Sequence, residues 1–166
     1  MVRSCLILLM ILCCCLVSQA QTGHYRGQRT AGVIGGIGKD SYLGGIEATL
    51  FLGRNYGISG TAGYEIASVF GVDENRMFFD AQLNYNIFNK DSKFYLIGKG
   101  GLSFSNDETK GTEQFSSSSF RSGANISVRI EQFVSSQLLV LAQGTQKFFF
   151  DGEERYAVTV GLNYIF

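Results

Sequence analysis

Few side chains in this sequence belong to the types that carry out chemistry. The only histidine is His24, and all four cysteines lie near the start of the chain, at Cys5, Cys13, Cys14 and Cys15. A serine hydrolase needs a histidine within hydrogen-bond reach of its serine, and zinc sites are built mainly from histidine and cysteine. A single histidine placed before the first regular segment argues against both. The sequence therefore predicts no catalytic residue, no metal site and no cofactor.

The remaining candidates are charged residues that share one face of alternating segments. They are Glu47, Glu65, Asp80, Lys99, Arg121, Arg129, Glu131, Lys147 and Arg155. Opposed carboxylates and bases could form an enzyme site. The alternative is a structural network of ion pairs, because charges that are taken out of water need partners to offset the loss of hydration. We favour the structural network.

Strict alternation of apolar and polar residues shows which elements must position these charges. From Tyr156 to Phe166 every second residue is apolar or aromatic, and the residues between them are mostly small or polar. The stretches 77–88 and 120–130 show the same period of two. Side chains along a strand point alternately to opposite faces, so each stretch predicts a strand with one apolar and one polar face.

Eight such segments follow one another along the chain. They are Thr30–Gly38, Tyr42–Gly53, Tyr56–Ala67, Asn75–Phe88, Lys93–Phe104, Ser118–Glu131, Gln137–Phe149 and Glu154–Phe166. Most are close to the roughly 9–11 residues that a tilted strand needs to cross a bilayer. Lipid offers no hydrogen bonds to an open sheet edge, so the last strand must pair with the first. The sequence predicts an all-β fold, an up-and-down eight-stranded antiparallel transmembrane β-barrel.

The connections between these segments differ in length. Short polar turns at residues 54–55, 89–92 and 134–136 are expected on the periplasmic side, and the stretches Ser105–Ser117 and Phe70–Glu74 are expected as outward loops. The terminal aromatic Phe166 predicts recognition by the bacterial barrel-insertion machinery. An eight-stranded barrel is just wide enough for its own side chains to fill it, so the charged face should form its interior.

Aromatic side chains near the segment ends predict two belts that face the membrane interfaces. The periplasmic belt is predicted to hold Tyr56, Tyr85, Phe94, Phe133, Tyr164 and Phe166. The outer belt is predicted to hold Tyr42, Phe79, Phe104, Phe120, Phe148 and Tyr156.

Residues 1–20 have the features of a signal peptide. Arg3 is their only charge, an apolar core follows, and Ser18 and Ala20 are small residues placed as at a cleavage site. The apolar stretch is short for a transmembrane anchor, and Cys13, Cys14 and Cys15 lack the small residue that normally precedes a lipidated cysteine. We expect export, cleavage before Gln21, and one barrel domain over residues 21–166 in the lipid of a bacterial outer membrane.

Overall charge restricts the choice of partners. Fourteen basic residues balance fourteen acidic residues. Nucleic-acid binding depends on basic residues that displace counterions from phosphates. No direct nucleic-acid binding is therefore expected.

Several short motifs together resemble a known family. After Ala20-Gln21 come Gly27-Gln28-Arg29, Ala31-Gly32, Lys99-Gly100-Gly101-Leu102, Leu138-Leu139-Val140-Leu141-Ala142 and Val160-Gly161-Leu162-Asn163-Tyr164-Ile165-Phe166. In this arrangement the chain resembles the conjugal transfer protein TraO family of Bacteroides-type conjugative elements. The resemblance implies a non-enzymatic outer-membrane component of a DNA-transfer apparatus that acts through other transfer proteins. A surface barrel for adhesion or envelope stability stays open as an alternative, as does, with less support, a lipid-modifying enzyme.

Overall fold

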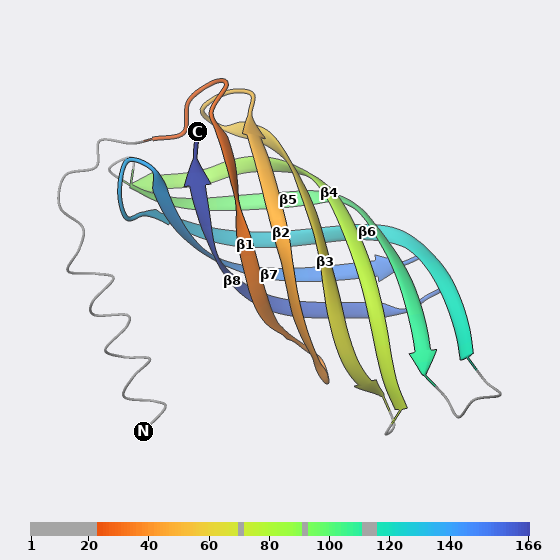
Figure 1. Cartoon of the computed structure of the whole chain (residues 1–166). Coiled ribbons are helices and arrows are strands. Elements are labelled where there is room, and N and C mark those ends of the chain that lie inside the picture. The colour runs from red at the N-terminus through yellow and green to blue at the C-terminus, as the bar shows by residue number, and fades with distance from the viewer. Residues whose placement is uncertain (1–22, 70–71, 91–92, 111–115) are drawn as a thin grey trace, which may run out of the picture.

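The computed structural model describes residues 23–69, 72–90, 93–110 and 116–166. The predicted signal peptide lies outside the described residues. Eight antiparallel strands form one closed barrel in which each strand pairs with its neighbours in sequence and β8 pairs with β1 (Figure 1). The strands are β1 (Arg29–Gly38), β2 (Ser41–Phe51), β3 (Tyr56–Val69), β4 (Val72–Lys90), β5 (Phe94–Lys110), β6 (Ser116–Phe133), β7 (Leu138–Phe149) and β8 (Glu154–Ile165). The predicted fold class is confirmed.

The two ends of the barrel differ. At one end, the turn end, lie the end of β4 and the start of β5, the connections at residues 52–55 and 134–137, and the C-terminus. At the other end, the hairpin end, β4, β5 and β6 extend past their neighbours (Figure 1). In bacterial barrels the longer extensions face away from the periplasm, so the extended β4–β6 strands agree with the predicted orientation, in which the turn end faces the periplasm.

Two of the predicted loops are largely strand. β5 continues to Lys110 and β6 begins at Ser116, so most of the predicted Ser105–Ser117 loop is a paired hairpin. β4 begins at Val72, which likewise removes most of the predicted Phe70–Glu74 loop. Backbone pairing continues there beyond the apolar band, where both faces of a strand are polar and alternation gives no signal.

Closure brings neighbouring strands close together at glycines. A Cβ added at Gly101 would lie 1.9 Å from the carbonyl oxygen of Ala81, on the adjacent β4. An added Cβ at Gly123 would lie 2.2 Å from the carbonyl oxygen of Phe148. These glycines make room for neighbouring backbone, which lets the strands coil into a narrow barrel.

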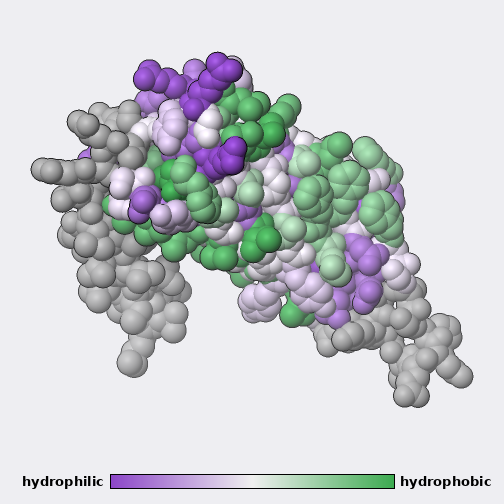
Figure 2. Space-filling view, turned by 45° about the horizontal axis from the view of Figure 1, so that its top comes forward, coloured by the Kyte–Doolittle hydropathy of each residue, from purple (hydrophilic) through white to green (hydrophobic). Residues whose placement is uncertain are grey.

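The outside of the barrel is apolar. Tyr42, Leu83 and Val160 leave 75%, 69% and 62% of their surface exposed. Figure 2 shows hydrophobic side chains over the body of the barrel and hydrophilic side chains gathering toward its ends. A continuous apolar surface of this kind is unfavourable in water and matches a lipid environment. No helix among the described residues is long and apolar enough to cross a membrane.

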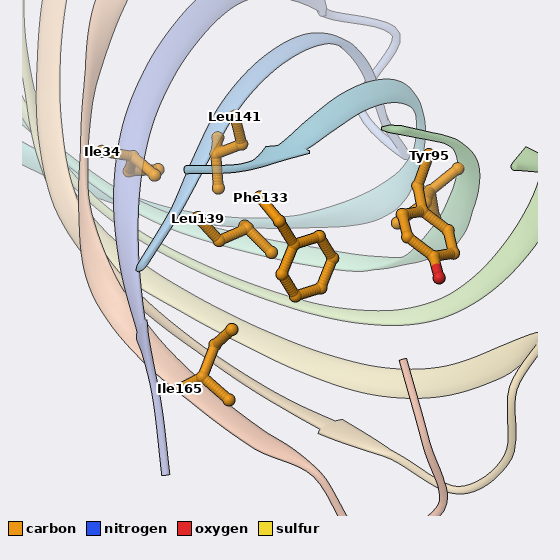
Figure 3. Close-up of a cluster of buried hydrophobic side chains, with 7 residues drawn as sticks. Ile34, Tyr95, Phe133, Leu139, Leu141 and Ile165 are labelled. Carbon is orange, nitrogen blue, oxygen red and sulfur yellow. The ribbon is translucent and has the colours of Figure 1, made fainter. Parts of the chain in front are cut away.

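One residue of the predicted periplasmic belt is wrongly placed. Phe133 is 1% exposed and points into the barrel, where it packs in a cluster with Tyr95 and Leu139 (Figure 3). It lies two residues after Glu131, so the period of two puts both side chains on the interior face. The other belt residues lie on the outward face of their strands, among them Tyr56 and Tyr85, which pair directly.

Candidate functional site

The barrel interior holds all nine charged residues that the sequence singled out. The structure arranges them in levels along the barrel axis, and each level has its own partners. Glu47, Lys99, Arg129 and Glu131 form a cluster on the turn-end side that we call central because it joins β2 to β5 and β6 across the lumen. Asp80 and Lys147 meet halfway along the axis, and Glu65, Arg121 and Arg155 lie toward the hairpin end.

Four fully buried charges form the central cluster. The Lys99 ammonium lies 3.1 Å from Oε2 of Glu47, and Nη1 of Arg129 donates a 2.6 Å hydrogen bond to Oε1 of the same carboxylate. Arg129 also lies 3.2 Å from Oε1 of Glu131. Two carboxylates and two cations balance one another, which offsets the cost of taking four charges out of water.

Polar side chains surround the second ion pair, in the middle of the barrel. The Lys147 ammonium lies 2.9 Å from Oδ2 of Asp80 and 4.2 Å from the centre of the Phe78 ring. The Ser103 hydroxyl donates a 2.6 Å hydrogen bond to Asp80. Nearby, the Gln82 amide donates to Asn125. The side chains that contact one another at this level come from β4, β5, β6 and β7.

Arginines dominate the level at the hairpin end. Nε of Arg121 lies 3.0 Å, and Nη2 of Arg155 2.5 Å, from the same carboxylate oxygen of Asp107. Both arginines also contact Glu153, in the β7–β8 connection. These pairs tie β5, β6 and β8 together where the barrel opens to solvent.

Sequence analysis missed Arg76 and Asp107. Arg76 bridges Glu65 at 3.1 Å and Glu74 at 2.5 Å. Its position has the same parity as Asp80, so alternation could have placed it inside. Asp107 was assigned to a loop, and only the continuation of β5 to Lys110 brings its carboxylate into the interior.

His24 closes the turn end. Its ring stacks on Phe51 with centroids 3.8 Å apart and packs against Tyr95 and Phe133. Nε2 lies 2.8 Å from Oε2 of Glu131, which links the ring to the central cluster. The sequence placed His24 before the first strand; the structure adds that this side chain is buried and seals the barrel mouth.

Little open space remains between these levels. A cavity lined by Thr61, Glu65, Asp80, Lys147 and Arg155 has a volume of about 30 Å³. That is room for about one water molecule. The described interior therefore has no space for a polymer to pass.

The arrangement is suited to holding strands together. Within the described residues no group of three histidine, cysteine or acidic side chains is placed to hold a metal ion, and the His24 ring nitrogens contact Glu131 and Gln28. Most of the charged groups contact one another, although Arg121 Nε forms no hydrogen bond in the described structure.

Comparison with solved structures gives a consistent set of neighbours. The N-terminal β-barrel domain of Pseudomonas aeruginosa OprF matches with a TM-score of 0.70 at 12% identity, covering 86% of this chain and 100% of that one. Neisserial surface protein A matches with a TM-score of 0.64 at 11% identity, over 84% and 96% of the two chains. Ail, the attachment invasion locus protein of Yersinia pestis, matches with a TM-score of 0.60 at 12% identity, over 85% and 99%.

No protein-family model matches the chain, and a search of curated proteins gives no match. At these identities the likeness to solved structures concerns the fold. Closed topology, an apolar exterior and a filled interior define the chain as a small eight-stranded β-barrel of the outer-membrane type.

Proposed function

We propose that this chain is a non-enzymatic outer-membrane component of a conjugative DNA-transfer apparatus and works through contacts with other transfer proteins. The motifs that resemble the TraO family suggest a role in conjugal DNA transfer. Action through protein contacts is inferred from the filled interior, in which Glu47, Lys99 and Arg129 form the central cluster and His24 seals the turn end. A barrel without a passage offers partners only its outer surfaces and its two ends.

Export and assembly are part of this proposal. The signal peptide directs the chain across the inner membrane, and Phe166 presents a terminal aromatic to the barrel-insertion machinery. Purified mature protein should begin at Gln21, and removal of Phe166 should lower the amount of folded barrel in outer-membrane fractions. An intact N-terminus in those fractions would contradict the cleavage.

The turn end is the favoured contact surface for transfer proteins, because it lies opposite the extended β4–β6 strands and we expect it to face the periplasm. Arg54 and Asn55 in its first turn are exposed, whereas Glu108 is exposed at the hairpin end. The two ends therefore offer matched sites for charge reversal, Arg54→Glu and Glu108→Lys.

The decisive experiment deletes the gene from a conjugative element and measures transfer frequency. Complementation with the wild type or with Glu108→Lys should restore transfer, and complementation with Arg54→Glu should restore less at equal protein levels. Unchanged transfer after deletion would refute a role in conjugation.

A surface barrel for adhesion or envelope stability is the second candidate. The extended β4–β6 region favours it, because this region carries exposed groups such as Glu108, Ser118 and Phe120 at the hairpin end. Ail, which shares the fold, is an attachment invasion locus protein. If Glu108→Lys abolished cell binding and deletion of the gene left transfer frequency unchanged, this second function would replace the first.

A further inference from the structure

A groove crosses the lipid-facing surface of β1 to β5. Its volume is about 1050 Å³, and its lining is mostly apolar. The floor consists of Ala31, Ala48, Gly60 and Ala81, which are direct partners across four neighbouring strands. Their outward side chains are a methyl group or a hydrogen, so the surface is lowest along this row.

Larger residues bound the groove. Tyr164, the partner of Ala31 on β8, ends the row at one side, and Leu102, the partner of Ala81 on β5, ends it at the other. Leu50, Ile58 and Leu83 form a wall on the side of the turn end. Strands lie about 4.8 Å apart, so a row from β1 to β5 is about 19 Å long. This length suits one extended acyl chain.

The groove runs diagonally with respect to the barrel ends. Ala31, Ala48 and Gly60 are the third, fourth and fifth residues of their strands counted from the turn end. Because strands tilt by about 35–45° from the barrel axis, the floor, about 14 Å long from β1 to β4, lies about 9 Å deeper at Ala81 than at Ala31. One end therefore lies at headgroup level and the other within the hydrocarbon.

A positive charge stands at the headgroup end. Arg29 is exposed, lines the groove together with Phe166, and forms no ion pair with another described residue. A guanidinium matches the geometry of phosphate oxygens and remains charged at any physiological pH. Because Arg29 lies at the mouth of an apolar groove, the groove is complementary to an amphiphile that has an anionic head and an apolar chain.

We propose that this groove binds one phospholipid of the periplasmic leaflet, with its phosphate at Arg29 and one acyl chain along Ala31, Ala48, Gly60 and Ala81. Because lipid tails solvate apolar surfaces equally well, close van der Waals fit to the small-residue floor supplies the preference over ordinary lipid contacts. The proposal is independent of the role in DNA transfer.

The test uses the full chain in vesicles of phosphatidylethanolamine and phosphatidylglycerol, extracted in mild detergent and weighed by native mass spectrometry. Wild type should retain one phospholipid. Ala48→Leu combined with Gly60→Leu fills the floor and should lower occupancy about tenfold, because the close fit is lost. Ala142→Leu, an outward-facing change on β7 away from the groove, should retain the lipid.

Arg29→Gln tests the contact with the lipid headgroup separately from the contact with the acyl chain. This variant should retain several-fold less phosphatidylglycerol than wild type but bind the headgroup-free probe dioleoylglycerol equally well. Circular dichroism confirms that each variant is folded. Equal lipid retention by wild type and the floor-filled variant would overturn the proposal, as would a retained second copy of the chain that is lost when the floor is filled.

Discussion

Neutralising Glu47 tests the central cluster most severely. Its carboxylate accepts hydrogen bonds from Lys99, Arg129, Thr61 and Asn163, and its side chain is fully buried. Glu47→Gln keeps the shape but leaves two buried cations facing the single carboxylate of Glu131. Breaking a buried pair by removing one partner costs about 3–5 kcal/mol, since the remaining charge is uncompensated.

Urea titration of the barrel folded in lipid vesicles measures this loss. With a loss of about 4 kcal/mol and an m-value of about 2 kcal/mol/M, the unfolding midpoint should fall by roughly 2 M. Glu65→Gln is the matched control. Its partner Arg76 keeps Glu74 at 2.5 Å, so no buried cation is left without a carboxylate, and the loss should be about 1 kcal/mol.

A second substitution should rescue the first. Adding Lys99→Met to Glu47→Gln leaves Arg129 and Glu131 as a balanced pair, and more than half of the lost stability should return. A midpoint shift for Glu47→Gln no larger than that for Glu65→Gln, or no recovery in the double variant, would refute the view of the interior as a charge-balanced network.

Three further changes probe other parts of the barrel by the same titration. Val160→Arg, on the lipid face in the middle of β8, should cost about 2–4 kcal/mol, and tolerance would contradict the lipid contact. Gly101→Ala should cost about 1–3 kcal/mol because its methyl meets backbone, whereas Gly144→Ala, with open space around it, should change stability by no more than about 1 kcal/mol; equal effects would count against close strand approach. His24→Ala should cost about 1–3 kcal/mol through the lost stacking and the loss of the partner of Oε2 of Glu131, and an unchanged midpoint would show that the seal at the turn end contributes nothing.

Most of the fold could be predicted because a lipid-facing strand must alternate. Each strand from β1 to β8 overlaps a predicted segment, since one apolar and one polar face leave a period of two in the sequence. The signal disappears where β5 and β6 continue beyond the apolar band, and there Asp107 was assigned to a loop. Phe133 was misplaced for a different reason: its aromatic character was weighed above its parity with Glu131.

Alternation predicts the face of a residue but not its level along the barrel axis. Glu47 and Arg129 lie 82 residues apart in sequence, and only the register of all the strands between them brings the two side chains together. The contact between His24 and Glu131 depends on how the segment before β1 folds into the barrel mouth. No sequence pattern contains that information.

Spin labels along β8 test most directly whether this barrel lies in lipid around a filled interior. Single cysteines at positions 158–163 can be introduced into the chain from Gln21 onward, which holds no other cysteine. Labels replacing Val158, Val160 and Leu162 should be open to oxygen dissolved in the bilayer, and labels replacing Thr159 and Asn163 should be protected from oxygen and from water-soluble relaxants alike. Equal accessibility along the strand, or access of the water-soluble relaxant to position 160, would contradict a lipid-embedded barrel with a closed interior.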